Sequence, residues 1–329
     1  STATQVTFTI DKATSTTTIT CPASVTYDGT AQTPCTAAVQ GVGTVTATAT
    51  LTYTANTDAG TATVNASTTG DANHTGSSAT PVTFTIDKAT STTTITCPAS
   101  AVYTGSALTP CTAAVTGAGG LNTTATVTYA NNTNVGTATA DASFAGDANH
   151  TASTATPVTF TIDKAASTTT ITCPTSVTYD GTAQTPCTAA VTGAGGLTTT
   201  VTVTYANNTN VGTATANATY VGDANHLGSS AVAQTFSIGK ATSTTTIACP
   251  VSVLYDGTTQ TPCTAAVTGA GGLNTTATVT YANNTNAGTA TADASFPGDA
   301  NHAGSTATQV TFTIDKATST TTITCPASV

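Results

Sequence analysis

The sequence predicts an all-β protein, a tandem array of antiparallel β-sandwiches with about seven strands each. Three observations predict this fold class: one unit of 76 residues recurs down the chain, small apolar residues alternate with threonine, and every unit carries two cysteines at a constant spacing. Alternation with a period of two is typical of half-buried strands, and threonine suits the solvated face because it is polar and β-branched.

The repeat is clearest in the rarest residues, because each occurs at only one or two positions of the unit. The histidines are His74, His150, His226 and His302, and the only basic residues are Lys12, Lys88, Lys164, Lys240 and Lys316. Residues 305–329 are identical to residues 1–25. We therefore expect a window cut from a longer array, and a subunit whose two unfinished ends join neighbours is the rival interpretation.

Domain boundaries are expected where an Asp-Lys-Ala junction ends one strand and a Thr/Ser-rich strand begins. The complete units are then residues 13–88, 89–164, 165–240 and 241–316, with 1–12 as the last strand of a preceding unit and 317–329 as the start of a following one. The linkers are short and lack Gly/Ser runs, so adjacent units should hold a restricted orientation.

The second unit illustrates the expected order of elements, which amounts to an Ig-like architecture. The pattern predicts a first strand over Ser91–Cys97, a short strand over Ala101–Tyr103 and a third strand with Cys111, Ala113 and Val115 inward. A loop over Gly117–Gly120, a strand over Thr124–Ala130 and a turn over Asn131–Asn134 follow. The unit then ends with a strand that has Ala138, Ala140, Ala142 and Phe144 inward, a turn over Gly146–Asn149 and a closing strand over Val158–Ile162.

The two cysteines of each unit predict a structural disulfide. The expected pairs are Cys21–Cys35, Cys97–Cys111, Cys173–Cys187 and Cys249–Cys263, and the partner of Cys325 would lie beyond the last residue. Closing a loop of this length stabilises a fold by about 3 kcal/mol. Free or redox-active thiols are the alternative, while zinc is disfavoured because no second close cysteine pair or nearby histidine accompanies the spacing. Disulfides imply an oxidising, extracytoplasmic setting.

The composition disfavours several classes of function. There is no arginine or glutamate and the formal net charge is −9, so the basic surface that binds nucleic acid is missing and anionic membrane surfaces are disfavoured. No run approaches the roughly 18 apolar residues of a transmembrane helix. We expect no cofactor, no metal and no enzymatic activity, because the chain lacks a nucleophile elbow, suitably paired carboxylates and a Gly-rich phosphate loop.

Three features of the unit remain as candidates for chemistry. The Gly-Asp-Ala-Asn-His motif, which ends at each histidine, could help to ligate calcium, although its Asp and Asn can instead satisfy the backbone of their own turn. We expect the histidine to be a strand-edge or packing residue rather than a metal ligand. The single lysine could form an amide cross-link with an asparagine, but its place at the unit boundary favours a solvated side chain.

Threonine and asparagine suggest surface roles. Rows such as Thr44–Thr50 could present hydroxyls to ice or glycans or carry O-linked sugars, but strand propensity on a solvated face is the simpler explanation. The Asn-x-Thr/Ser triplets at Asn65, Asn122, Asn131 and Asn149 are glycosylation acceptors only where the source has the machinery.

Two stretches carry a resemblance to a known family. Residues 144–165 read F-A-G-D-A-N-H-T-A-S-T-A-T-P-V-T-F-T-I-D-K-A and are followed, after Ala166, by S-T-T-T-I-T. Residues 25–34 read V-T-Y-D-G-T-A-Q-T-P. They resemble parts of the bacterial Ig-like (Big-type) tandem repeats of large surface adhesins and cell-surface fibre proteins. The resemblance implies an Ig-like fold and a spacer role, and it carries over no site residue. The histidine stands where such repeats more usually have an aromatic residue, and the cysteine pair is not a general family feature.

We expect a non-enzymatic, extracellular array that forms the shaft of a bacterial surface fibre, stalk or adhesin. Its partners would be neighbouring repeats or copies of the same chain, with a cell-surface or glycan ligand as a further candidate. The alternatives are a multivalent module that binds glycan, ice or another cell, and a filament whose subunits complete one another's sandwiches by strand addition.

Overall fold

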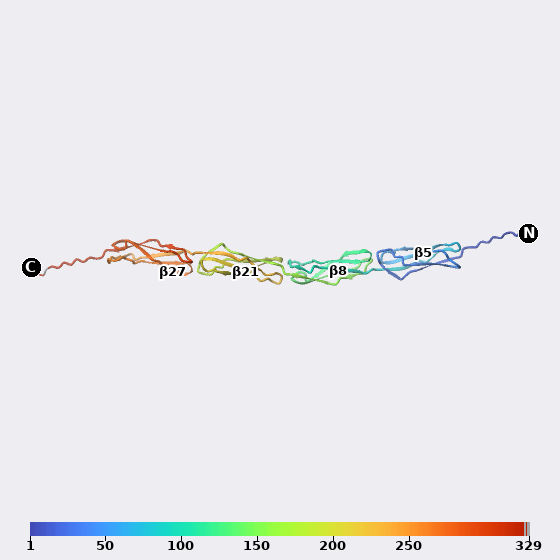
Figure 1. Ribbon diagram of the computed structural model, residues 1–329, viewed down its shortest axis with the longest axis horizontal. Helices are drawn as coiled ribbons and strands as arrows, with labels where there is room; N and C mark the ends of the chain where they lie inside the picture. Colours follow the sequence, from blue (N-terminus) through green and yellow to red (C-terminus); the bar gives the residue numbers. More distant parts are fainter. Residues whose placement is uncertain (326, 328–329) are drawn as a thin grey trace. The chain divides into compact units, whose positions relative to one another are not determined.

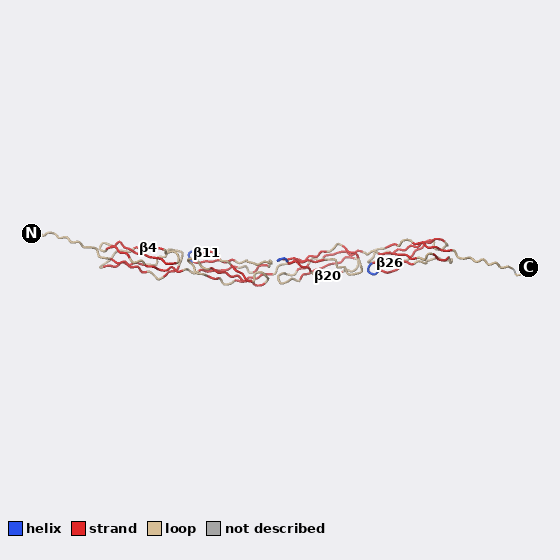
Figure 2. Tube along the Cα trace, turned by 180° about the vertical axis from the view of Figure 1, so that it is seen from behind, coloured by secondary structure: helices blue, strands red, loops and turns tan. Residues whose placement is uncertain are grey.

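The computed structural model describes residues 1–325 and residue 327. It confirms the predicted fold class, because 52% of the chain is strand and only 3% is helical, with a periodicity of about 76 residues and one disulfide per repeat. Two compact units, residues 1–164 and 165–329, each hold two repeats and are described separately. The first unit runs from blue to green in Figure 1, and Figure 2 shows the strands of both units in red.

Unit 1 contains fifteen strands and one short 3-10 helix. Repeat 1 consists of β1 (Ser15–Thr20), β2 (Ser24–Thr26), β3 (Thr36–Gly41), β4 (Thr50–Thr54), β5 (Gly60–Gly70), β6 (Thr75–Ser78) and β7 (Val82–Asp87). Repeat 2 consists of β8 (Ser91–Thr96), β9 (Ser100–Val102), β10 (Thr112–Gly117), η1 (Ala118–Gly120), β11 (Leu121–Thr124), β12 (Val127–Ala130), β13 (Gly136–Phe144), β14 (Ser153–Thr154) and β15 (Val158–Asp163).

Unit 2 contains two repeats with the same elements as repeat 2. Repeat 3 consists of β16 (Ser167–Thr172), β17 (Ser176–Thr178), β18 (Thr188–Gly193), η2 (Ala194–Gly196), β19 (Leu197–Thr200), β20 (Val203–Ala206), β21 (Gly212–Tyr220), β22 (Ser229–Ser230) and β23 (Gln234–Gly239). Repeat 4 consists of β24 (Ser243–Ala248), β25 (Ser252–Leu254), β26 (Thr264–Gly269), η3 (Ala270–Gly272), β27 (Leu273–Thr276), β28 (Val279–Ala282), β29 (Gly288–Phe296), β30 (Ser305–Thr306) and β31 (Val310–Asp315).

Each repeat folds into two sheets, as repeat 2 illustrates. One sheet has the order β11-β10-β8 and the other β12-β13-β15-β9, with β14 paired to β13. The neighbours are antiparallel except for β9 and β15, which run parallel. The period-two pattern does not reveal this parallel pair. Repeats 3 and 4 have the same order, whereas the first sheet of repeat 1 pairs only β1 with β3.

A thin core lies between the two sheets of each repeat. In repeat 2, Phe160 and Ile162 of β15 are buried with Ala138 and Ala140 of β13. The ring of Tyr129 meets that of Phe160 edge to face, with the ring centres 6.3 Å apart. Ala138, Ala140 and Ala142, which were predicted to face inward on β13, are buried, whereas Phe144 is half-buried. The small alanines allow the two sheets to pack closely.

The expected strand over Thr124–Ala130 is wrong, because the structure divides it between the two sheets. β11 ends at Thr124 and pairs with β10, and β12 begins at Val127 and pairs with β13. The Ala125 N–H still donates to the carbonyl of Ala113 in the first sheet, at 3.2 Å. The chain changes sheets at residues 125–126.

The two end segments lie outside the sheets. Residues 1–12, expected to be the last strand of a preceding unit, belong to no strand, and Val6, Phe8 and Ile10 within them are 83–85% exposed. Residues 317–325, expected to open a following unit, are likewise not in a strand, and residues 326, 328 and 329 lie outside the described residues. Among the described residues, no helix has the length and hydropathy to cross a membrane.

Candidate functional site

Each complete repeat contains the disulfide that its cysteines predict. The S–S distances are 2.04–2.07 Å and the Cα atoms of each pair lie 4.3 Å apart. In repeat 1, Cys21 follows β1 and Cys35 precedes β3, so the bond ties together the ends of two paired strands. Cys325 is free and exposed. The disulfides indicate a protein that is not cytoplasmic.

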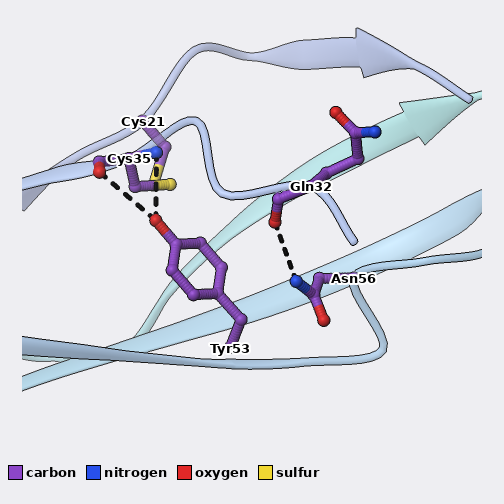
Figure 3. The surroundings of a disulfide bond; sticks show 5 residues. All are labelled: Cys21, Gln32, Cys35, Tyr53 and Asn56. Atoms are coloured by element: carbon purple, nitrogen blue, oxygen red, sulfur yellow. Dashed lines mark hydrogen bonds between the residues drawn. A yellow bond between two sulfur atoms is a disulfide. The ribbon is translucent and has the colours of Figure 1, made fainter. Parts of the chain in front are cut away.

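A tyrosine hydroxyl holds the backbone of the second cysteine. The Tyr53 hydroxyl accepts from the Cys35 N–H and donates to the Cys35 carbonyl, each at 3.2 Å (Figure 3). Beside it, the Asn56 side-chain amide donates to the Gln32 carbonyl at 2.8 Å. The same hydroxyl contacts recur in repeats 2, 3 and 4. The tyrosine hydroxyl thereby satisfies the N–H and the carbonyl of Cys35, directly before β3 begins.

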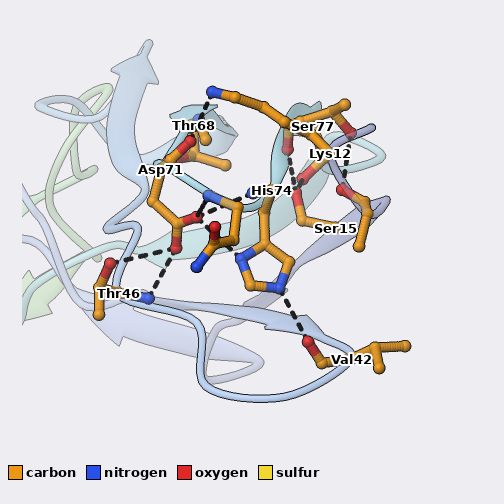
Figure 4. Close-up of polar contacts among 12 residues, drawn as sticks. Lys12, Ser15, Val42, Thr46, Thr68, Asp71, His74 and Ser77 are labelled. Carbon is orange, nitrogen blue, oxygen red and sulfur yellow. Dashed lines mark hydrogen bonds and ion pairs between the residues drawn. The ribbon is translucent and has the colours of Figure 1, made fainter. Parts of the chain in front are cut away.

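The Gly-Asp-Ala-Asn-His motif forms a turn that is closed by its own aspartate. In repeat 1, Asp71 Oδ1 accepts from the backbone N–H groups of Asn73 and His74, each at 2.9 Å, and contacts His74 Nδ1 at 2.8 Å (Figure 4). Asp147, Asp223 and Asp299 close the corresponding turns of the other repeats. The carboxylate is thus engaged with N–H donors of its own turn, which is the backbone-satisfying arrangement expected as the alternative to calcium binding.

The histidine of this motif is buried and carries a positive charge. Only 2–5% of each histidine is exposed. In repeat 1, His74 Nε2 donates to the Val42 carbonyl at 3.0 Å, while Nδ1 faces the Asp71 carboxylate. Both neighbours are acceptors, so both ring nitrogens donate and the ring is an imidazolium.

The same contacts set the direction of the pKa shifts. The Val42 carbonyl, together with Asp71, raises the pKa of His74 above its ordinary value. Burial opposes the charge on His150, but the Ala118 carbonyl and Asp147 outweigh it and raise the pKa. The Thr46 N–H and the His74 side chain hold the pKa of Asp71 well below its usual range. Both shifts favour the charged forms of the two side chains.

Within unit 1, this turn is also where repeat 2 meets repeat 1. The ring of Tyr27, which follows β2, packs edge to face on the ring of His150, with the centres 5.4 Å apart. Asn149 Oδ1 accepts from the Ala59 N–H at 2.8 Å, and its Nδ2 donates to Asp58 Oδ1 at 3.0 Å. One turn of repeat 2 therefore binds two separate segments of repeat 1, and these contacts define the junction.

At this junction the backbones of the two repeats also lie in close contact, at Gly29 of repeat 1 and Gly119 of repeat 2. A Cβ atom at Gly29 would collide with Gly119 Cα, and one at Gly119 would lie 2.6 Å from the Tyr27 hydroxyl. The histidine supports this surface, because His150 Nε2 donates to the carbonyl of Ala118, which begins η1, at 2.9 Å. Only glycine permits such an approach of two backbones.

Within unit 2, the junction between repeats 3 and 4 has the same construction. The rings of Tyr179 and His302 lie 5.4 Å apart at 88°, and Asn301 Oδ1 accepts from the Val211 N–H at 3.1 Å. Asn301 Nδ2 donates to Asn210 Oδ1 at 3.2 Å, where unit 1 has Asp58 in the equivalent place. In the part of the chain that the structure describes, no folded repeat follows repeat 4, and its Tyr255 is 36% exposed.

The lysine at the repeat boundary is bonded to the following repeat rather than simply solvated. Lys88 Nζ donates to the Asp147 carbonyl at 2.5 Å, and Lys12 Nζ donates to the Asp71 carbonyl at 2.6 Å. Lys240 makes the same bond to the Asp299 carbonyl. The lysine therefore ties the linker to the turn that forms the junction.

Sequence reasoning found the parts of the junction but not the junction itself. It expected the histidine as a packing residue and the Asn as a turn residue, and it assigned no role to Tyr27. The structure brings Tyr27, Asn149 and His150 together across two repeats. The available signal was that the histidine, the acidic turn and a Tyr-x-Gly turn, with Asp at x in three of the four repeats, recur at the same positions of every repeat.

No family model and no curated protein matches this chain. The resemblance to bacterial Ig-like repeats therefore stays a prediction from the quoted stretches.

Proposed function

We propose that the chain is a non-enzymatic structural array, the shaft of a bacterial surface fibre, stalk or adhesin, and that its functional site is the junction. The observation that carries the proposal is the recurrence of the Tyr-His-Asn contact set in both units, at Tyr27 with His150 and at Tyr179 with His302. A spacer needs a fixed relation between neighbours, and a repeated interface supplies it without new chemistry.

The chemistry of the junction supports a fixed relation rather than a flexible tether. The Asn149 amide is held at both of its atoms, and the lysine of the linker is bonded as well. A short linker whose flanking residues are bonded on both sides cannot behave as a random coil. We infer that successive repeats within a unit hold one orientation.

Four disulfides support the proposed extracellular location, because such bonds persist in oxidising compartments. Neighbouring repeats or copies of the same chain are the proposed partners. A Big-type identity agrees with this role and rests on the resemblance alone.

A multivalent binding module is the second candidate. One observation favours it: the outer face of the larger sheet pairs threonines across strands, as in Thr137 with Thr161 and Thr139 with Thr159. Such hydroxyl rows could meet a glycan or an ice surface, and identical copies would give avidity.

Retention of the full oxidised chain on a glycan array and on an ice-affinity column distinguishes the two candidates. The spacer predicts no retention on either. Retention that weakens when Thr139 and Thr159 are both changed to Lys would contradict the spacer and support the binding module. As a matched control, the pair Thr92→Lys and Thr116→Lys places the same charges at paired positions of the smaller sheet.

A further inference from the structure

The parallel strand pair of each repeat joins its entry to its exit. In repeat 2, β9 pairs with β15 in the register Ser100 with Thr161, Ala101 with Ile162 and Val102 with Asp163. Two more bonds extend this ladder: the Thr161 N–H donates to the Ala99 carbonyl at 3.1 Å, and the Tyr103 N–H donates to the Asp163 carbonyl at 2.9 Å. Repeats 1, 3 and 4 contain the equivalent ladder.

Parallel pairing decides how tension acts on this ladder. The chain enters repeat 2 through β8 and reaches the N-terminal end of β9, and it leaves from the C-terminal end of β15. In a parallel pair these are opposite ends of the ladder. Pulling the chain therefore slides the two strands along each other and loads all bonds together, whereas an antiparallel pair would open one bond at a time.

The disulfide lies next to this ladder on the same path. Cys97 directly follows β8 and Cys111 directly precedes β10, and β8 and β10 are paired. If the β9–β15 ladder yields, tension passes from β8 through the sulfur atoms into β10. The residues between the two cysteines, which include β9, then cannot lengthen.

From this arrangement we propose that each repeat is a tension-bearing unit, in which the parallel ladder resists the first pull and the disulfide limits the extension that follows. The inference rests on the proposed function in one respect only, since a shaft is pulled at its ends. The load path itself depends on the topology of a single repeat and not on any ligand or location.

Single-molecule pulling of the full oxidised chain, held by tags at both ends, tests the disulfide. After the repeats have unfolded at constant force, addition of dithiothreitol reduces each disulfide to two thiols as the dithiol is oxidised to its cyclic disulfide. Each cleavage should release the residues between paired cysteines, which are separated by 14 positions. At roughly 3.6 Å per extended residue, the expected further step is about 50 Å. Unfolding without any step on reduction would overturn the proposal.

A matched pair of proline variants tests the ladder. Thr161→Pro removes the N–H that bonds to Ala99, whereas Thr159→Pro makes the same change two residues earlier on β15, outside the register with β9. Thr161→Pro should move one unfolding event to lower force, and Thr159→Pro should leave the force of that event closer to wild type. Equal effects of the two variants would overturn the ladder as the resisting element.

The step on reduction is measured on the unaltered chain, so it remains decisive if a proline variant fails to fold. Failure of the pulling tests would leave the spacer role standing, because a shaft can be stiff without bearing load. Retention on glycan or ice would contradict the spacer role without affecting the pulling result.

Discussion

Repeats 1 and 2 differ most in the loop that follows the strand after the second cysteine, which is β3 in repeat 1 and β10 in repeat 2. In repeat 2 the sequence Ala-Gly-Gly forms η1, and the chain returns as β11 beside β10. In repeat 1 the same place reads Val-Gly-Thr, and no strand pairs with β3 on that side. Gly119 and Gly120 both have positive φ, at 60° and 77°, and Thr44 stands where Gly120 would be. A β-branched residue rarely adopts that conformation, so the chain cannot turn back.

The loop of repeat 1 takes a different partner. Thr46 donates to Asp71 Oδ2 through its backbone N–H at 2.8 Å and through its hydroxyl at 3.1 Å (Figure 4). The Asp71 side chain is 11% exposed, against 40% for Asp147 in repeat 2. The segment that extends a sheet in repeat 2 thus covers the acidic turn in repeat 1. In repeats 2 and 4 the same loop also provides the surface on which the preceding repeat docks.

Removal of the disulfide should have the largest effect on the stability of both repeats. Replacing Cys21 and Cys35, or Cys97 and Cys111, by Ala should cost about 3 kcal/mol in either repeat, because the closed loops are equal in length. Repeat 1 has only two strands in the affected sheet, so it should unfold at the lower urea concentration. Hydrogen exchange of peptides from each repeat along a urea series measures this. Equal midpoints would show that β11 adds no stability.

Gly120→Thr should convert the loop of repeat 2 toward that of repeat 1. A Cβ at Gly120 meets no atom within 4 Å, so the penalty is one of backbone conformation alone. We expect a loss of about 1–3 kcal/mol and loss of exchange protection in β11. The reverse change, Thr44→Gly, should gain protection around residues 45–48. If Gly120→Thr left β11 protected, the explanation from φ would be wrong.

The two repeats should also differ in acid. The pKa values of Asp71 and Asp147 are lowered in the folded state, so their stabilisation is present above the ordinary Asp value and is lost as pH falls through the folded one. Thr46 adds two bonds to Asp71, so repeat 1 should keep its ion pair to lower pH than repeat 2. Carboxyl resonances followed by NMR between about pH 1 and 5 test this order.

At the alkaline side the repeats should behave alike. The pKa values of His74, His150 and His302 are raised, so their stabilisation is full below about pH 6.5 and is lost as pH rises through the folded value. We expect the ring nitrogen shifts to remain those of an imidazolium to a higher pH than in a free histidine. A neutral ring at pH 6 would contradict the assignment of both nitrogens as donors.

The smallest effect concerns a single hydroxyl. Thr46→Ala removes one of the two bonds to Asp71 and should cost about 0.5–1 kcal/mol. Asn122→Ala changes the equivalent residue of repeat 2, where Asn122 is exposed, and should stay within about 0.5 kcal/mol of wild type. A larger cost at Asn122 than at Thr46 would contradict the comparison.

The sequence was informative wherever alternation alone decides structure. Phe160 and Ile162 were predictable as inward residues, and the cysteine spacing predicted one disulfide per repeat. The change of sheet at residues 125–126 was not predictable, because the alternation of the pattern continues across it. Ala125, Val127 and Tyr129 occupy every second position, as they would in one continuous strand. The parallel pairing of β9 depends on where a three-residue strand docks, and no local pattern encodes that.

The junction could not be predicted for a different reason. Tyr27 and His150 belong to different repeats, so their contact depends on the relative orientation of two folded domains. Periodicity shows that residues share a phase but does not show which of them meet. The charge of the histidine could not be predicted either. It follows from the two acceptors that face the ring nitrogens, and one of them is a backbone carbonyl.

The central claim is that consecutive repeats within a unit hold one orientation through this junction. Residual dipolar couplings of the full oxidised chain, fitted separately for residues 13–88 and 89–164, test it most directly. We predict a single common alignment tensor in the wild type, two different tensors in Tyr27→Ala, and no change in Tyr255→Ala, whose ring has no docked repeat. Two different tensors in the wild-type chain would contradict a fixed junction.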